Sequence, residues 1–394
     1  MAIETARRSR TADTNWRCLV ICPPVLIPQW IGEIVCQDPG QAMTTVNRLP
    51  LDVEHLSGYI IMSIYDLTSA PVRQSLATCL FDVVIVDEAH RMKNRKTKTA
   101  QHIKHIPAAR KLCLTGTPME KNPADLWSLL NYIAPDDFPV YWSFVMKHLQ
   151  VTEGYFERYV VGGAVDPEAF GQLLRPYMLR RTKTEVAPQL PPRIDIILAV
   201  CLGVEQGRLY SELRSQKDLL ATAGGKEFLV QNALTMLVRL QQISAWPALL
   251  GFPKSAVSGK LEWLEEFLVD HPDDRIVVFT RFRDLAEYLA DKYRCDIIIG
   301  GRKEVRGDPK LLVGTIDAMG EGLNLGWAQH AIFLDSHWST IKMSQAFDRI
   351  HRIDAKEPKN VYLLWSTKED KLVLEALAHK WTEAELVYHY LQEL

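Results

Sequence analysis

The sequence predicts an α/β protein with two lobes, each built on a parallel sheet covered by helices. The chain has 394 residues, which is long for one hydrophobic core and suits two domains. Short apolar runs recur in two sets, and their apolarity is continuous rather than alternating, as in strands buried on both faces. Polar segments with helical spacing lie between the runs and can supply the crossovers of a parallel sheet.

The two sets of apolar runs divide the chain into its parts. The first set predicts strands at residues 19–21, 59–62, 83–86 and 112–114, and the second at 276–279, 297–299, 311–313, 331–334 and 361–364. We therefore assign residues 1–185 to the first lobe, with a helical insertion at about 125–175, and residues 256–394 to the second. Residues 186–255 are assigned to a linker and helical protrusion, because a proline-rich break opens them.

Composition limits the classes of function. Hydrophobic residues make up 47% of the chain and charged residues 24%, as in ordinary globular proteins. The formal net charge is −2, so any basic surface must be local. The seven cysteines have no CxxC pair and no zinc-type spacing with histidine, which predicts free thiols. Because no secretory signal or membrane-length run is visible, we expect a cytoplasmic location in a bacterium or infected host cell, or a nuclear one in a eukaryote.

The strongest local motif is VVIVDEAH at residues 83–90. A buried strand ends there in two adjacent carboxylates, and ligands of open α/β sheets bind beyond the carboxyl ends of the strands. Asp87 suits Mg²⁺, which prefers a few carboxylates together with phosphate oxygens. Glu88 can polarise an attacking water, and His90 can link the site to a neighbouring loop. The alternative is a solvated Asp-Glu pair at a strand end.

Two further strands end in small or glycine-spaced loops. The run LCLTGTP at residues 112–118 places Thr115 and Thr117 where they can touch the carboxylates, although alone it predicts an ordinary turn. The run GTIDAMGEGLNL at residues 314–325 contains Gly320 and Gly322 in a loop whose backbone N–H groups can approach an anion. As a bare glycine pattern, this second signal is weak.

The run QAFDRIHR at residues 345–352 carries two arginines. The i,i+3 spacing of Arg349 and Arg352 predicts that they share one helix face. Two guanidinium groups on one face can act as arginine fingers on a γ-phosphate. The alternative is a set of surface salt bridges with Asp348 and Asp354.

The order of these motifs resembles that of helicase superfamily two. DEAH, LTGTP, IVVFTRF, GEGLNL and QAFDRIHRI follow one another along the chain. Other runs are similar to the Swi/Snf branch, namely LVICPPVLIPQW at 19–30, RMKN at 91–94, TGTPMEKNPADLWSLL at 115–130, LRRTK at 179–183 and LVRLQQISAWPAL at 237–249. The resemblance covers nearly the whole chain. It implies two RecA-like lobes and a DNA-dependent ATPase that uses ATP and Mg²⁺ to move along duplex DNA.

The resemblance also implies a role for each matching residue. ATP would bind between the lobes, with Asp87 holding Mg²⁺, Glu88 orienting water, and His90 completing the catalytic set together with Arg349 and Arg352. The residues assigned to nucleotide binding are Gln345, Gly320, Gly322, Thr115 and Thr117.

DNA contacts are expected from basic segments and loops. Residues 91–111 hold eight Lys or Arg and no carboxylate, which suits phosphate contact, although a solvated basic helix has the same composition. With the loops that the resemblance adds, the assigned DNA-binding residues are Pro23, Pro24, Arg91, Lys93, Asn94, Arg180, Arg181 and Asn324. We expect Trp127, Trp142, Trp246 and Trp263 to pack in the core rather than stack on bases.

The sequence departs from the family in three places. It contains no GxGKT phosphate-binding loop, which the resemblance places just before Met1. We therefore expect a truncated start, or a separate chain that supplies the loop, and weak ATP binding by these 394 residues alone. Asp354 and Ala355 stand where the family usually has Gly-Gln, and the span 280–320 is short.

Three other functions stay open at the level of sequence. One is a DNA-binding or scaffold protein that hydrolyses no ATP because it lacks the phosphate-binding loop. Another is the motor of a restriction or repair nuclease, whose nuclease would be on a partner chain. The third is an RNA helicase, which stimulation of ATP hydrolysis by RNA rather than duplex DNA would reveal.

Overall fold

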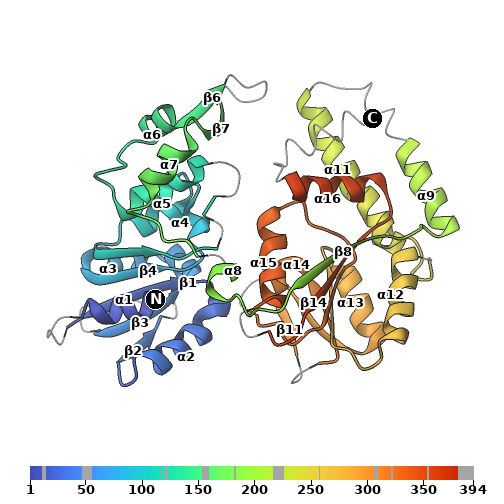
Figure 1. Ribbon diagram of the computed structural model, residues 1–394, viewed down its shortest axis with the longest axis horizontal. Coiled ribbons are helices and arrows are strands. Elements are labelled where there is room, and N and C mark those ends of the chain that lie inside the picture. The colour runs from blue at the N-terminus through green and yellow to red at the C-terminus, as the bar shows by residue number, and fades with distance from the viewer. Residues whose placement is uncertain are drawn as a thin grey trace. The chain divides into compact units, whose positions relative to one another are not determined.

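The chain forms two compact units, Met1–Arg180 and Arg181–Leu394 (Figure 1). The computed structural model describes residues 1–10, 15–46, 56–116, 118–119, 123–152, 159–181, 183–215, 226–256, 258–305, 309–320, 323–352 and 355–379. Each unit contains one large sheet with helices on both faces, which confirms the predicted α/β fold class. The boundary between the units lies close to residue 185, the predicted end of the first lobe.

The first unit is built on a five-stranded parallel sheet in the order β2-β3-β1-β4-β5. Its strands are β1 (Arg17–Cys22), β2 (Met43–Thr45), β3 (Gly58–Ser63), β4 (Phe81–Val86) and β5 (Ala108–Cys113). The central strands β1, β3 and β4 are almost entirely buried, as their continuous apolar runs predict. The topological switch point lies at β1, which has β3 on one side and β4 on the other.

Helices cover both faces of this sheet because the alternate side chains of each strand point to opposite sides. The helices α1 (Ala2–Arg8) and α2 (Ile27–Gln37) pack on one face. The helices α3 (Ala70–Thr78), α4 (Lys98–Lys104) and α5 (Leu126–Ile133) pack on the other. Short 3₁₀ helices lie at Pro24–Leu26, Ile64–Thr68, Ala89–Met92 and Pro123–Asp125.

A small subdomain follows the sheet, in the region predicted as a helical insertion. It contains α6 (Tyr141–His148), the antiparallel strands β6 (Leu149–Thr152) and β7 (Val160–Ala164), and α7 (Pro167–Leu174). These elements share a hydrophobic cluster with α5. The insertion is therefore not purely helical, because a β-hairpin contributes to it.

The second unit contains a seven-stranded sheet in the order β11-β10-β12-β9-β13-β14-β8. All neighbouring strands are parallel except β10 and β11. Its strands are β8 (Arg193–Ala199), β9 (Ile276–Thr280), β10 (Asp296–Ile299), β11 (Arg302–Glu304), β12 (Leu311–Thr315), β13 (His330–Phe333) and β14 (Lys359–Trp365). The helices α12 (Gly259–Asp270) and α13 (Arg283–Tyr293) pack on one face, and α14 (Ile316–Met319) and α15 (Thr340–Ile350) on the other.

Strand β8 corrects the predicted domain plan. It lies within residues 186–255, which we assigned to a linker and protrusion, yet it pairs with β14 along its whole length. The strand is only partly buried, with Ile194 and Ile197 exposed. Its sequence does contain a short apolar run at residues 196–199, which the strand prediction overlooked. The rest of this region contains α8 (Lys183–Val186), α9 (Val204–Ser215), α11 (Lys226–Ala245) and the 3₁₀ helix Pro247–Leu250.

Helix α11 packs against α16 (Lys368–His379), which follows β14. Among the described residues, every helix is too short or too polar to cross a lipid bilayer.

Candidate functional site

The carboxylate of Asp87 lies at the carboxyl edge of the first sheet, directly after β4. Its backbone N–H donates to the Ile21 carbonyl of β1 at 2.8 Å, which places it beside the topological switch point. One carboxylate oxygen, Oδ2, accepts a hydrogen bond from Trp30 Nε1 at 2.9 Å, and Oδ1 accepts one from the Glu88 backbone N–H at 2.8 Å. Open α/β sheets bind ligands at this position.

Glu88 adopts a left-handed backbone conformation, with φ 49° and ψ 46°. Such a conformation is uncommon for a residue with a side chain and costs of order 1–3 kcal/mol, so the surroundings must maintain it. The next residue, Ala89, donates its backbone N–H to the Leu114 carbonyl at 2.9 Å, which ties the turn to the end of β5. The turn thus holds Glu88 one residue beyond Asp87 at the strand end.

His90 joins the two loops that follow β4 and β5. Its Nδ1 lies 3.2 Å from Glu88 Oε2 and 3.5 Å from Thr115 Oγ1. The side chains of His90 and Glu88 are 15% and 18% exposed, so both are reachable from solvent but largely enclosed. Four predicted residues, Asp87, Glu88, His90 and Thr115, therefore meet at one edge of the sheet, whereas Thr117 lies outside the described residues.

A cavity of about 240 Å³ lies against Asp87 and is lined by the beginning of α1 and by α2, including Gln29, Trp30 and Glu33. It is smaller than the roughly 300–1,000 Å³ of typical small-molecule sites, so it suits part of a ligand rather than a whole nucleotide. The Asp87 carboxylate is a hard oxygen ligand of the kind that Mg²⁺ prefers. Sequence reasoning missed Trp30 as a partner of Asp87, although Trp30 ends the LVICPPVLIPQW run.

The predicted DNA-binding residues of the first unit have unequal access to solvent. Pro24 is exposed, but Pro23 is buried, which corrects our expectation that its side chain could contact DNA. Arg91 donates to the Tyr65 hydroxyl at 2.9 Å, and Asn94 Oδ1 accepts from the Lys96 backbone N–H at 3.1 Å.

Arg180 and Arg181, which lie on either side of the unit boundary, are exposed. Lys93, in the first unit, is half-buried.

Part of the basic segment 91–111 packs on aromatic rings instead of forming a continuous solvated stripe. The Arg95 guanidinium lies 4.3 Å from the ring centroid of Tyr141, and Lys104 Nζ lies 4.7 Å from that of Trp127. Trp127 is only 7% exposed, in agreement with its expected place in the core. The expectation is wrong for Trp142, which is 43% exposed because it lies on the outer face of α6.

In the second unit, both predicted arginines hold the loop that follows α14. Arg349 Nε donates to the Gly320 carbonyl at 3.0 Å, and Arg352 Nη1 donates to the Leu323 carbonyl at 3.3 Å. The Leu325 backbone N–H in turn donates to the Arg349 carbonyl at 2.9 Å. The structure therefore brings together the last two motifs, and it gives the arginines carbonyl partners that the salt-bridge alternative did not foresee.

The expected shared helix face is wrong in detail. Helix α15 ends at Ile350, and His351 leaves the helical conformation with φ −97° and ψ 80°. The His351 ring lies 2.8 Å from the Pro191 carbonyl, a contact with the segment before β8. Arg349 is thus the last basic residue of the helix, and Arg352 reaches the same loop from beyond its end.

Around these arginines, Gln345 and Gly320 lie close together. A Cβ atom built on Gly320 would lie 3.7 Å from Gln345 Cβ and 3.0 Å from the Ile316 carbonyl oxygen, so a larger residue would crowd this turn. Gly322 lies outside the described residues. Asn324 is exposed, and its Oδ1 accepts a hydrogen bond from the Gly326 backbone N–H at 3.0 Å.

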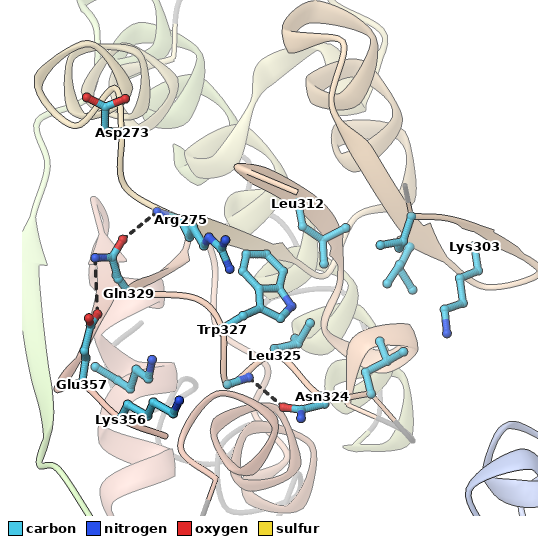
Figure 2. Close-up of a pocket in the computed structure, with 15 residues that line it drawn as sticks. Asp273, Arg275, Lys303, Leu312, Asn324, Leu325, Trp327, Gln329, Lys356 and Glu357 are labelled. Carbon is cyan, nitrogen blue, oxygen red and sulfur yellow. Dashed lines mark hydrogen bonds between the residues drawn. The ribbon is translucent and has the colours of Figure 1, made fainter. Parts of the chain in front are cut away.

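Asn324 also lines a cavity of about 920 Å³ in the second unit (Figure 2). Figure 2 shows Trp327 beside Leu312 and Leu325, with Arg275 on one side and Lys356 below. The cavity lies at the amino ends of the strands, because Arg275 and Gln329 immediately precede β9 and β13. That edge is opposite to the one where open α/β sheets bind nucleotides, so we do not assign this cavity to ATP.

Sequence reasoning missed a polar cluster at the carboxyl edge of the second sheet. Asp335, two residues after the end of β13, is almost completely buried and accepts hydrogen bonds from Thr280 Oγ1 at 2.5 Å and the Arg281 backbone N–H at 2.8 Å. Burial raises the pKa of Asp335, although these hydrogen bonds oppose the shift. The signal was available, since the run AIFLD repeats the pattern of an apolar strand that ends in aspartate.

Two family models match the chain in succession. The model of the SNF2-related domain matches residues 3–249, and the model of the helicase conserved C-terminal domain matches residues 259–354. Together they match residues in both units, including the β4 and α15 motifs, and end at residue 354.

Curated relatives are similar over most of this chain. The mouse SWI/SNF-related matrix-associated actin-dependent regulator of chromatin subfamily A member 1 is 28% identical over 74% of the chain and 30% of its own length. An ISWI chromatin-remodelling complex ATPase of Arabidopsis thaliana is 29% identical over 91% of the chain and 37% of its own length. A putative ATP-dependent helicase/translocase of Bacillus subtilis is 26% identical over 89% of the chain and 40% of its own length. The chain thus spans about a third of the length of the curated relatives it matches.

Among solved structures, a Sulfolobus solfataricus SWI2/SNF2 ATPase core in complex with dsDNA is 24% identical, with a TM-score of 0.42. The match covers 96% of this chain and 82% of that one.

Proposed function

The chain belongs to the SNF2-related family, and from this premise we propose that it is an ATP-dependent motor that couples hydrolysis to movement along duplex DNA. The observation that carries the proposal is the meeting of Asp87, Glu88, His90 and Thr115 at the switch point of the first sheet. Two loops that are separate in sequence form one polar site there, with acidic groups fixed by named hydrogen bonds. A solvated Asp-Glu pair at a strand end would not require these contacts.

Within this site we assign Asp87 to Mg²⁺ and Glu88 to the attacking water. When bound, the ion would neutralise charge on the phosphates and orient them. The hydrogen bonds from Trp30 and the Glu88 backbone restrict the rotation of the Asp87 carboxylate, so it is preorganised. Glu88 can hold the water because its left-handed turn fixes its position, and His90 couples it to Thr115.

The proposal also assigns residues of the second unit to the nucleotide. Arg349 and Arg352 are assigned to the phosphates, with Gln345 and Gly320 beside them; Thr117 and Gly322 keep the roles that the resemblance implies. The structural support is that the two arginines donate to the Gly320 and Leu323 carbonyls, so a phosphate that attracts them would compete with these contacts.

The proposed partner is the phosphate backbone of duplex DNA. Pro24, Arg91, Lys93, Asn94, Arg180, Arg181 and Asn324 are the proposed contacts, and exposure supports Pro24, Asn94, Arg180, Arg181 and Asn324 most directly. Contacts of this kind position a protein without reading base sequence, so we expect no sequence preference.

Glu88→Gln in the 394-residue chain provides the test. The change keeps the side chain's shape but removes the carboxylate, so we expect the DNA-stimulated kcat to fall by about 10²–10⁴-fold. Glu168→Gln, at an exposed position of α7, is the matched control and should leave kcat unchanged. Hydrolysis would be followed by phosphate release with and without duplex DNA.

A Glu88→Gln chain with full activity would refute the assigned role. A wild-type chain that binds duplex DNA yet hydrolyses no ATP would refute the motor proposal for these 394 residues and favour the DNA-binding scaffold. If RNA stimulated hydrolysis and duplex DNA did not, the motor would act on RNA.

A further inference from the structure

Two histidines and an aspartate, none of them assigned a role above, meet at the amino edge of the second sheet. His271 is the C-cap residue of α12, Asp274 lies in the turn before β9, and His330 opens β13. One ligand atom of each residue lies within 4.8 Å of the ligand atoms of the other two. Among the described residues, this is the group of three whose side chains can hold one metal ion.

The tautomer of His271 is fixed in the form that a metal needs. Its Nδ1 lies 2.9 Å from the Phe267 carbonyl oxygen, which can only accept a hydrogen bond. Nδ1 therefore carries the proton, and Nε2 presents a lone pair. The ring also stacks on Phe267, with centroids 4.0 Å apart and an interplanar angle of 16°. A histidine that donates one ring N–H to a backbone carbonyl is the usual arrangement of a metal ligand.

His330 supplies an independent sign that something is missing from this site. The residue is only 7% exposed, and its Nε2 lies 3.0 Å from Asp274 Oδ2. Its other nitrogen, Nδ1, is buried and has no hydrogen-bond partner among the described residues. Leaving a buried polar atom unpaired is costly, so the contacts of this ring within the protein are incomplete.

Ring packing alone is the competing explanation. Phe267 and Tyr362 lie 5.4 and 5.9 Å from the His330 ring, so an aromatic cluster does surround the histidines. Packing explains neither the convergence of Asp274 on both imidazoles nor the unpaired nitrogen, and phenylalanine would fill the same space. Neutral imidazoles with one carboxylate are the ligands that zinc-type cations select, whereas Mg²⁺ prefers oxygen ligands.

We propose that His271, Asp274 and His330 bind a divalent transition-metal ion of the zinc class, which ties α12 to the starts of β9 and β13. Three protein ligands leave a fourth position for water or another donor. The site adjoins the large cavity, because Arg275 and Gln329, which line the cavity, are the chain neighbours of Asp274 and His330. The Arg275 backbone N–H donates a hydrogen bond to Gln329 Oε1 at 2.9 Å. It is independent of the proposed motor function, because it shares no residue with it.

The test is competition for Zn²⁺ between the intact 394-residue chain and a chromophoric chelator. His271→Phe keeps a ring that can stack on Phe267 but has no nitrogen, and Asp274→Asn keeps the shape while removing the charge. Each should weaken zinc binding by about tenfold or more if the three residues form the site. Binding of Co²⁺ should give a visible absorption band in the wild type that both variants lose.

His105→Phe is the matched control. His105 is likewise the C-cap residue of a helix, α4, and its Nδ1 lies 2.6 Å from the carbonyl oxygen of Gln101, four residues earlier, just as His271 relates to Phe267. It should bind zinc as the wild type does. Because Zn²⁺ that binds the native state stabilises it, zinc should also raise the melting temperature of the wild type and His105→Phe more than that of His271→Phe.

A wild-type chain that takes up no Zn²⁺ from the chelator would overturn the proposal, and so would a His271→Phe chain that binds it as strongly as the wild type. If His105→Phe lost Zn²⁺ binding and Asp274→Asn retained it, the ion would be bound at the surface of α4, which would exclude the proposed site.

Discussion

Lys104 shows how a single buried charge makes the stability of the first unit depend on pH. Its ammonium group lies over Trp127 and donates to Asn131 Oδ1 at 2.7 Å, and burial together with nearby Arg95 lowers its pKa to about 8. The unfolded chain has the ordinary lysine value of about 10.4. Between these values the unfolded state binds more protons than the native state, so stability due to Lys104 rises with pH. It is fully present above the unfolded value and is lost as pH falls through about 8.

We therefore expect the difference in melting temperature between the wild type and Lys104→Met to change in favour of the wild type from pH 8 towards pH 10. Methionine fills similar space without a titratable group, so the comparison cancels the cysteines and tyrosines that titrate in the same range. Thermal unfolding of both chains at several pH values measures the difference. A difference that stays constant over this range would show that Lys104 is not desolvated.

Among single residues, the sequence predicts those site residues that lie next to a strand end along the chain. Asp87 directly follows β4, and Thr115 lies two residues after β5, so the edge at which they meet could be inferred from parallel pairing alone. Trp30 could not be inferred as a partner, because its contact with Asp87 depends on how α2 packs. His330 lies far along the chain from His271 and Asp274, so no local spacing reveals their cluster.

At the scale of elements, strand burial decides what the sequence can predict. Interior strands such as β9, with a neighbour on each side and helices on both faces, produce continuous apolar runs and were all predicted. The strands β2, β5, β8 and β11 lie at sheet edges, where fewer side chains are buried; of these only the end of β5 was predicted. The end of α15 was misjudged for a similar reason, since a tertiary contact of His351 accompanies it.

Gly314 tests how closely the elements of the second unit pack. It lies in β12 between β10 and β9, and an added Cβ would come within 2.2 Å of the Ile298 carbonyl oxygen and 2.8 Å of Met319 Sδ. Because the carbonyl belongs to a paired strand, it cannot move without breaking the ladder. Gly314→Ala should therefore destabilise the second unit by about 1–3 kcal/mol, as an overpacked core does.

Gly207→Ala is the control for this prediction within the same unit. Gly207 lies in α9, and the nearest atom to its added Cβ is Leu202 Cβ at 4.0 Å. Alanine should stabilise this helix by about 0.5–1 kcal/mol. Urea unfolding of both variants gives the two free energies of unfolding, and equal stability of Gly314→Ala and wild type would mean that β10 and β12 are further apart than described.

At the scale of the whole molecule, charge is nearly balanced but unevenly placed. The chain has 46 Lys and Arg against 48 Asp and Glu, so its summed field does not attract DNA. Many cations are also paired locally; Arg208, for example, contacts both Glu205 and Glu212 at 2.6 and 2.8 Å. The proposed attraction to DNA must therefore come from a few exposed cations such as Arg180 and Arg181.

The salt dependence of DNA binding measures how many of those cations contact phosphates. Each phosphate that the protein neutralises contributes about −0.9 to the slope of log K against log salt concentration on duplex DNA. The double variant Arg180→Ala/Arg181→Ala should therefore bind a mixed-sequence duplex with a slope that is shallower by about two. Arg208→Ala, which removes an arginine already paired with two glutamates, should leave the slope unchanged. Fluorescence anisotropy at several salt concentrations gives the slopes, and an unaltered slope in the double variant would place the DNA contacts elsewhere on the chain.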